Sequence, residues 1–135
     1  QVPRGETWAF YAGARGAGLP PALFQRRLII DPATTMARFD VPEEIVEAVE
    51  MMQVRYGVDA NLDGAIEQYV TADAVGDWAR IAAVRVALVT RSPEEYGTEV
   101  DNANYIVDDT TFNPVNDRRV RQVFVSTIAI RNRLP

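Results

Sequence analysis

The chain has 135 residues and a net charge of -5, with 47% hydrophobic and 24% charged residues, which predicts a single globular domain over residues 1–135. All 14 basic residues are arginines, and histidine, cysteine and lysine are absent, which excludes zinc sites built on His or Cys, thiol nucleophiles, Ser-His-Asp triads and Schiff bases. The acidic balance also argues against a nucleic-acid partner, which needs clustered cations.

The sequence shows no membrane-spanning or targeting segment. No apolar run approaches the roughly 20 residues that cross a bilayer, and the start lacks both a signal-peptide pattern and an initiating methionine. Because the chain begins Gln1-Val2-Pro3, we expect it to be a fragment cut from a longer protein.

The first third of the chain predicts two strands. Residues 7–11 alternate, with Trp8 and Phe10 on one face, and residues 23–30 form the second strand. The glycine-rich stretch between them, residues 13–18, is interpreted as a surface turn, because no lysine follows and two prolines block a helix that could hold an anion.

The middle of the chain leaves one choice open. Residues 31–39 read as irregular, and residues 40–44 fit the first turn of a short helix, with Asp40 as its cap. The apolar residues that follow also fit the beginning of a long strand, and periodicity alone does not decide between the two.

Residues 46–70 predict two strands joined by an acidic loop. The alternation of Met52, Val54, Tyr56 and Val58 is typical of a half-buried strand, and residues 66–70 form the returning strand.

Three segments complete the chain. Residues 71–77 form a polar link in which Asp73 caps a single turn that places Trp78. Residues 81–90 predict a strand with Ala82, Val84, Val86 and Leu88 facing inward and Ala83, Arg85 and Ala87 facing outward. Residues 94–116 form a long excursion with a short edge strand at 105–107, and residues 120–131 form the last strand.

These elements define a mainly β protein of the α+β class, an antiparallel sheet of five or six strands with little helix. A sheet with nothing to pack on must close on itself or borrow its missing layer. We therefore expect an open apolar face, partly exposed in this chain, that is shared by three strands: Met52, Val54, Tyr56, Val84, Val86, Leu88, Phe124, Ile128 and Ile130.

The acidic loop is the densest cluster of candidate metal ligands. Asp59, Asn61 and Asp63 with the following glycine match positions 1, 3, 5 and 6 of a calcium loop, Ala65 would give its carbonyl at position 7, and Glu67 falls at position 9. Position 12 is a valine and strands flank the loop, so this is no EF-hand. The alternative is a polar hairpin turn without metal, since Asp, Asn and Gly are common turn residues.

Arg118, Arg119 and Arg121 follow the excursion directly and suggest two interpretations. They can neutralise Asp108, Asp109 and Asp117 at the surface, or they can form a patch that docks a neighbouring subunit.

Three stretches carry a family resemblance: VPEEIVEAVEMMQVRYGVDANLDGAIEQYV, AAVRVALVTRS and the closing RRVRQVFVSTIAIRNRLP. From about Ala22 onward the chain resembles the C-terminal part of PilW-type minor pilins of the type IV pilus. A weaker similarity extends to the minor pseudopilins of type II secretion. Family members commonly carry a D-x-[DN]-x-D-G stretch at the position of the acidic loop.

The resemblance implies a pilin-like sheet that lacks its N-terminal spine helix, the missing layer, and a precursor with a prepilin leader. It implies no enzymatic activity. It implies assembly with other minor pilins, the major pilin and a large tip adhesin, an inner-membrane and periplasmic stage anchored only by the missing helix, and an extracellular pilus stage.

The residues leave three alternative functions open: a calcium-dependent carbohydrate or surface-binding module, a small binding domain unrelated to pili, and an acid-pair hydrolase. The last has no acid pair that spacing singles out among the 19 acids.

Overall fold

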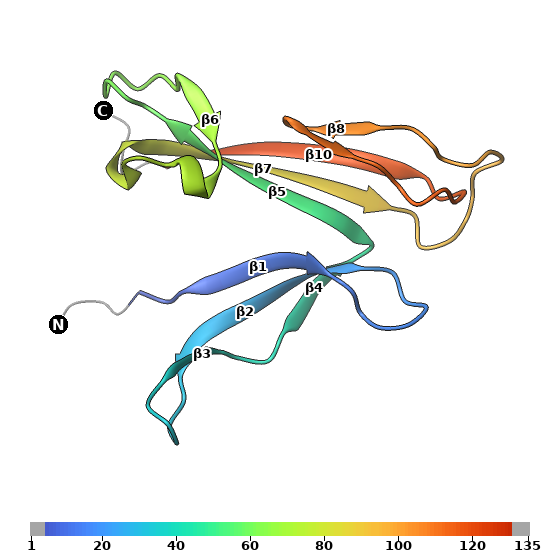
Figure 1. Cartoon of the computed structure of the whole chain (residues 1–135), viewed down its shortest axis with the longest axis horizontal. Coiled ribbons are helices and arrows are strands. Elements are labelled where there is room, and N and C mark those ends of the chain that lie inside the picture. Colours follow the sequence, from blue (N-terminus) through green and yellow to red (C-terminus); the bar gives the residue numbers. More distant parts are fainter. Residues whose placement is uncertain (1–4, 131–135) are drawn as a thin grey trace.

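The computed structural model describes residues 5–130 and shows a mainly β protein with antiparallel pairing, which confirms the expected fold class (Figure 1). Residues 1–3 and the closing RNRLP stretch lie outside the described residues. No helix within residues 5–130 is long and apolar enough to cross a membrane. The strands are β1 (Trp8–Gly13), β2 (Ala22–Ile30), β3 (Ala37–Phe39), β4 (Glu43–Glu47), β5 (Val49–Val58), β6 (Gln68–Val70), β7 (Ile81–Arg91), β8 (Tyr105–Val107), β9 (Thr110–Phe112) and β10 (Arg121–Ala129).

The strands form two four-stranded sheets, where the sequence predicted one. In the first sheet, β2 pairs with β1 on one side and with β3 and β4 on the other. The second sheet has the order β10-β7-β5-β6, and β8 and β9 form a separate hairpin. In Figure 1 the two sheets diverge from the junction between β4 and β5, with β1 lying between β2 and β5.

A bend at Ala48 separates the two sheets. Ala48 has a φ of 64°, the left-handed region that non-glycine residues rarely adopt. Its N–H donates to the carbonyl of Pro21, just before β2 of the first sheet (2.7 Å), and its carbonyl accepts from the Arg91 N–H in β7 of the second sheet (2.9 Å). The segment that sequence periodicity could not assign is therefore a strand on each side of the bend.

The expected apolar face of the second sheet is confirmed by the strand register. Three rows of residues cross β5, β7 and β10 on this face: Met52–Leu88–Phe124, Val54–Val86–Ser126 and Tyr56–Val84–Ile128. The face is not buried by the described chain, since Phe124 and Ile128 are 49% and 57% exposed.

The prediction that Ala83, Arg85 and Ala87 face solvent is wrong. Ala83 and Ala87 are buried, and Ala87 packs with Val89 and Val107 in the main hydrophobic cluster. For Ala87 the physical reason is the excursion, which folds back as the β8–β9 hairpin and covers this side of the sheet. Ala83 lies farther along β7, in the register opposite Gly57, where Ile66 and Tyr69 come close.

Charged and polar side chains pin that hairpin to the sheet. Arg85 Nη1 lies 2.7 Å from Asp108 Oδ1, and Arg55 forms an ion pair with Asp109. Gln53 Nε2 donates to the Thr110 hydroxyl at 3.1 Å. Asp108 and Asp109 thus neutralise arginines of the sheet, and not the arginines that follow the excursion.

The link after β6 contains two short 3-10 helices, η1 (Ala72–Ala74) and η2 (Trp78–Arg80). The predicted cap Asp73 lies inside η1, and Asp77 caps the turn that holds Trp78, because its carboxylate accepts from the Ala79 N–H at 2.9 Å. The Trp78 ring meets Tyr56 edge-on, with 4.9 Å between ring centroids.

Candidate functional site

The acidic loop begins where β5 ends. Asp59 follows Val58, and its backbone N–H donates to the Arg80 carbonyl at 2.9 Å. Its side chain is buried, with the residue only 1% exposed, and turns back into the loop. Its two carboxylate oxygens accept from the N–H groups of Asp63 (3.2 Å) and Gly64 (3.0 Å). The buried Asp59 carboxylate therefore holds the turn in place through hydrogen bonds to its backbone.

Three carboxylates converge in this loop. Ligand atoms of Asp59, Asp63 and Glu67 all lie within 4.8 Å of one another. Asp63 and Glu67 are exposed, while Asp59 is buried. The Glu67 carboxylate also accepts from the Ala60 N–H at 2.7 Å, and this hydrogen bond joins the two ends of the loop. The three acids that the sequence proposed as ligands are thus brought together.

The other two proposed ligands have different positions. Asn61 lies beside the carboxylates, with its Nδ2 donating to Asp63 Oδ2 at 3.0 Å. Ala65 donates its N–H to the other Asp63 oxygen at 2.8 Å. The backbone turns sharply at Leu62 (φ 62°) and Gly64 (φ 89°). Such a set of hard oxygen atoms matches the ligands that calcium prefers, and the same hydrogen bonds also describe a well-made turn.

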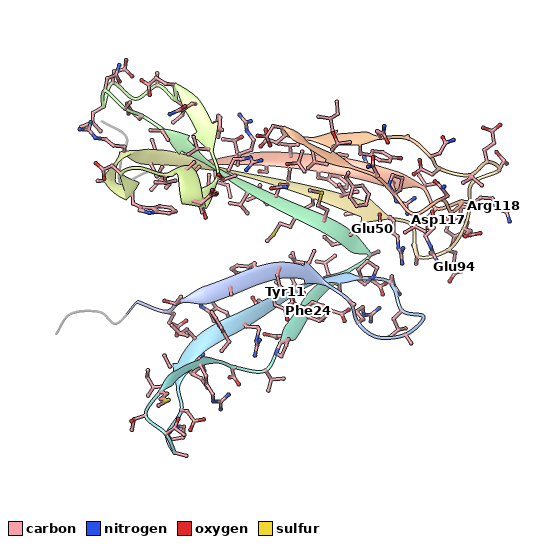
Figure 2. All side chains as sticks on the ribbon, viewed as in Figure 1. Tyr11, Phe24, Glu50, Glu94, Asp117 and Arg118 are labelled. Carbon is pink, nitrogen blue, oxygen red and sulfur yellow. The ribbon has the colours of Figure 1, made fainter. Side chains whose placement is uncertain are left out.

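The structure separates the three arginines of the proposed docking patch. The Arg121 side chain is 0% exposed and enclosed by acids. Arg119 is partly buried and donates to the carbonyls of Ser92 and Pro93. Arg118 is the exposed member, at 57%, with a loose 3.7 Å contact to Glu95. Arg121 is therefore a structural residue, and of the three arginines Arg118 is the one that presents its charge at the surface. Figure 2 shows Arg118 close to Asp117, at the same end of the molecule as Glu50.

The acids around Arg121 come from distant parts of the chain. Arg121 Nε lies 2.7 Å from Glu50, and Arg121 Nη1 lies 2.8 Å from Asp117 and 3.1 Å from Asp101. Glu50 also pairs with Arg91 at 3.0 Å. Figure 2 places Glu50 and Asp117 at the same end of the molecule. The cluster ties the excursion to β5, β7 and β10, and no sequence spacing singled out Glu50 for it.

The pKa values of two of these acids are lowered. For Asp117, the hydrogen bond from the Arg121 guanidinium is the largest cause. For Asp101, burial by itself raises the pKa, but hydrogen bonds from the Tyr105 hydroxyl, the Ala103 N–H and Arg121 together outweigh it, so the pKa is lowered. Both carboxylates are thereby held in the charged form.

An apolar groove of about 460 Å³ lies between the two sheets. One wall is the expected face of the second sheet, and the other comes from β1 and β2, which sequence analysis did not assign to it. The signal for this second wall was the alternation that puts Trp8 and Phe10 on one side of β1. The lining residues are Trp8, Phe10, Leu23, Met52, Val54, Tyr56, Val84, Val86 and Leu88.

The fold and these sites define a class: a mainly β domain with an uncovered apolar groove, suited to docking against other proteins. The family model described as type IV pilus-assembly protein W matches residues 9–132, and the chain belongs to this family. No curated protein and no solved structure is significantly similar to it. The protein therefore has a role in type IV pilus assembly, and the family points to a structural role among other pilus components.

Proposed function

We propose that the protein is a minor pilin, a non-enzymatic subunit that assembles with other minor pilins, the major pilin and a large tip adhesin. The observation that carries this proposal is the groove between the sheets. Its nine lining residues are all apolar or aromatic, and it stays open toward β10. In a pilin the natural occupant is an apolar helix of the fibre, which would supply the layer that this face lacks.

The energetics favour such an occupant. Phe124 and Ile128 extend the groove face and stand half exposed on β10. Fully burying an exposed side chain of this kind is worth about 1.5–3 kcal/mol. Because Phe124 and Ile128 are already about half buried, a docked helix would gain roughly half of that from each of them, in addition to the gain along the groove itself. A helix held in the groove would also anchor the subunit to the inner membrane before assembly and to the extracellular fibre afterwards.

The test is piliation in a strain whose own copy of this gene is deleted. Complementation with Phe124→Asp or Ile128→Asp should give few or no surface pili, because a carboxylate on this face opposes docking of an apolar helix. The matched control is Ile106→Asp, which changes a residue that is 73% exposed on the hairpin, away from the groove. Thermal melts of the purified variants check that they fold. Full piliation with both groove variants would overturn the proposal.

Arg118 is the second proposed contact with neighbouring subunits. It is exposed, and its ion pair with Glu95 is loose at 3.7 Å, so its charge is available to an acidic partner surface. Arg118→Glu should weaken co-purification of the other minor pilins at low salt, and the exposed Glu99→Arg serves as a charge-reversal control. If the other minor pilins were recovered unchanged with Arg118→Glu, Arg118 would be a solvated surface residue with no part in docking.

Calcium in the acidic loop is the third element of the proposal. It is supported by the convergence of Asp59, Asp63 and Glu67 within 4.8 Å, with Asn61 beside them and the Ala65 carbonyl as a further candidate ligand. A bound ion would hold the connection between β5 and β6 and so stabilise the edge of the second sheet. If the isolated domain bound glycans only with calcium, while loop variants left piliation intact, an adhesion module would be the better description.

A further inference from the structure

The outer edge of β10 is a long strand edge that the described chain leaves open. β10 is the terminal strand of its sheet and pairs with β7. Six consecutive residues, 124–129, are exposed, and they include Phe124 (49%), Val125 (58%) and Ile128 (57%). An exposed apolar edge of this length is a template for another strand.

The hydrogen-bonding pattern shows which backbone groups are available. Just before β10, the Ser92 N–H donates to the Val120 carbonyl (2.8 Å), and just after it the Ile130 N–H donates to the Ala82 carbonyl (2.8 Å). The antiparallel register between these two hydrogen bonds has no shift. The backbone N–H and C=O groups of the even-numbered residues in β10 therefore point toward β7. The N–H and C=O groups of Val123, Val125, Thr127 and Ala129 therefore point away from the sheet.

The other described edges carry features that oppose strand addition. β4 exposes Glu43, Glu44 and Glu47, while β3 and β6 have three residues each. β1 lies against β5. β10 has none of these protections, since residues 122–130 contain no charge and no proline, and its register contains no bulge. Short strands, charges, prolines and bulges are the usual means of blocking an edge.

We propose that this edge pairs with the same edge of a second copy of this chain, antiparallel, about a two-fold axis at Val125. Val125 then faces the partner's Val125, and Val123 faces the partner's Thr127, which matches the outward N–H and C=O groups of both strands. The two second sheets join into one continuous sheet of eight strands. Because the far edge of each sheet is the short strand β6, assembly stops at the dimer.

Charge favours a second copy as the occupant. The strip that the two copies share is uncharged over residues 122–130, so like charges do not meet there. Two charged side chains in the described part of the chain lie near this strip. Arg121, at the start of β10, is fully enclosed and paired with Glu50, and Arg85, opposite Thr127 on β7, is neutralised by Asp108 at 2.7 Å. The chain has a net charge of -5, but its acidic β4 edge lies in the other sheet and not at this contact.

Because the chain contains no cysteine, single cysteines report the pairing directly. In the proposed dimer, Val125 and the partner's Val125 have Cα atoms about 5.5 Å apart, within the range that a disulfide spans. Val125→Cys should form a disulfide-linked dimer under mild oxidation. Val115→Cys, which replaces a valine that is 73% exposed elsewhere, is the control and should stay mostly monomeric.

A mixed pair tests the register. Gln122 faces the partner's Ile128 in this arrangement, whereas Gln122 and the partner's Gln122 are about 20 Å apart along the strands. An equal mixture of Gln122→Cys and Ile128→Cys chains should therefore cross-link, and each variant alone should not.

Light scattering of the cysteine-free protein gives an independent readout. The wild-type mass should rise from one to two chains with concentration, Val125→Arg should remain at one, and Val115→Arg should behave as wild type. Melting temperatures show whether the arginine variants fold. The proposal is overturned if Val125→Cys cross-links no better than Val115→Cys, or if folded Val125→Arg dimerises like wild type. A different result would assign the edge to another protein. In that case wild type stays monomeric, and Val125→Arg loses another pilus protein that co-purifies with wild type.

Discussion

Arg121 and Glu50, 71 positions apart in sequence, form a two-pronged ion pair in which Nε lies 2.7 Å from Oε2 and Nη2 lies 3.2 Å from Oε1. The Arg121 side chain is fully enclosed, and Asp101 and Asp117 complete its shell. The pair joins the start of β10 to the start of β5. The excursion is held down by the same guanidinium, so one buried charge fixes three parts of the chain.

Arg121→Met should be strongly destabilising. Removal of the guanidinium leaves three carboxylates close together, with Arg91 beside Glu50 and Arg119 3.7 Å from Asp117 as the remaining cations. Breaking a buried ion pair in this way costs about 3–5 kcal/mol. Chemical denaturation measures the loss in the free energy of unfolding. The control Arg118→Met removes an exposed arginine and should change stability by no more than about 0.5 kcal/mol. Equal, small losses for both variants would contradict the role given to Arg121.

The same network predicts a dependence of stability on acid. The pKa of Asp117 is lowered, chiefly by the hydrogen bond from Arg121, and that of Asp101 is also lowered. A carboxylate whose folded pKa lies below its unfolded value of about 3.9 stabilises the fold fully above that pH. The stabilisation is lost as the pH falls through the folded pKa. The melting temperature should therefore drop below about pH 4.

Asp117→Asn isolates this contribution. The variant should be less stable than wild type at pH 7, and the difference should shrink as the pH falls below about 4, since wild-type Asp117 then also loses its charge. The exposed Glu99→Gln is the control and should follow the wild-type curve. A constant difference between Asp117→Asn and wild type from pH 7 to pH 2 would contradict the assignment.

The bend at Ala48 gives a prediction about backbone conformation. Its φ of 64° is costly for residues with a Cβ and most costly for a β-branched side chain. Ala48→Val should lower the free energy of unfolding by about 2 kcal/mol or more. Ala48→Gly should lie within about 0.5 kcal/mol of wild type, because relief of the left-handed strain offsets the lost methyl group and the greater freedom of the unfolded chain. Thermal melts measure these changes, and Ala17→Val, a substitution in an exposed loop, is the control. If Ala48→Val were as stable as wild type, the backbone at the bend would not be strained.

The sequence predicted the parts of this fold that depend on local alternation. Met52, Val54 and Tyr56 share a face with Val84, Val86 and Leu88 because period-two patterns fix which side a residue takes. It could not predict that Ala83 and Ala87 would be buried, since small residues fit either face and the hairpin that covers Ala87 is far away in sequence. The bend at Ala48 also carries no glycine to mark it. In the sequence, Glu50 is one of several closely spaced acids, and only its long-range pairing with Arg91 and Arg121 distinguishes it.

The acidic loop supplies the last prediction, which tests calcium binding through stability. Calcium takes six to eight oxygen ligands, and Asp59, Asn61, Asp63 and Glu67 offer side-chain oxygens close together, with water to complete the shell. Because the ion would bind the folded loop and not the unfolded chain, calcium at a hundred times its dissociation constant should stabilise the protein by about 2.7 kcal/mol. Magnesium should substitute poorly, since it prefers six close ligands and keeps its waters.

The measurement is a thermal melt in calcium, in magnesium and in a chelator. Wild type should melt at a higher temperature in calcium than in chelator, and Asp63→Ala should lose that difference, because one of its three converging carboxylates is gone. Glu99→Ala removes an exposed acid outside the loop and should keep the full calcium response. The Asp63 carboxylate also accepts the Ala65 N–H, so Asp63→Ala should melt lower than wild type even in chelator. The decisive quantity is therefore the difference between calcium and chelator within each variant. If wild type shows none, or Asp63→Ala shows as much as Glu99→Ala, the loop is a turn that holds no calcium.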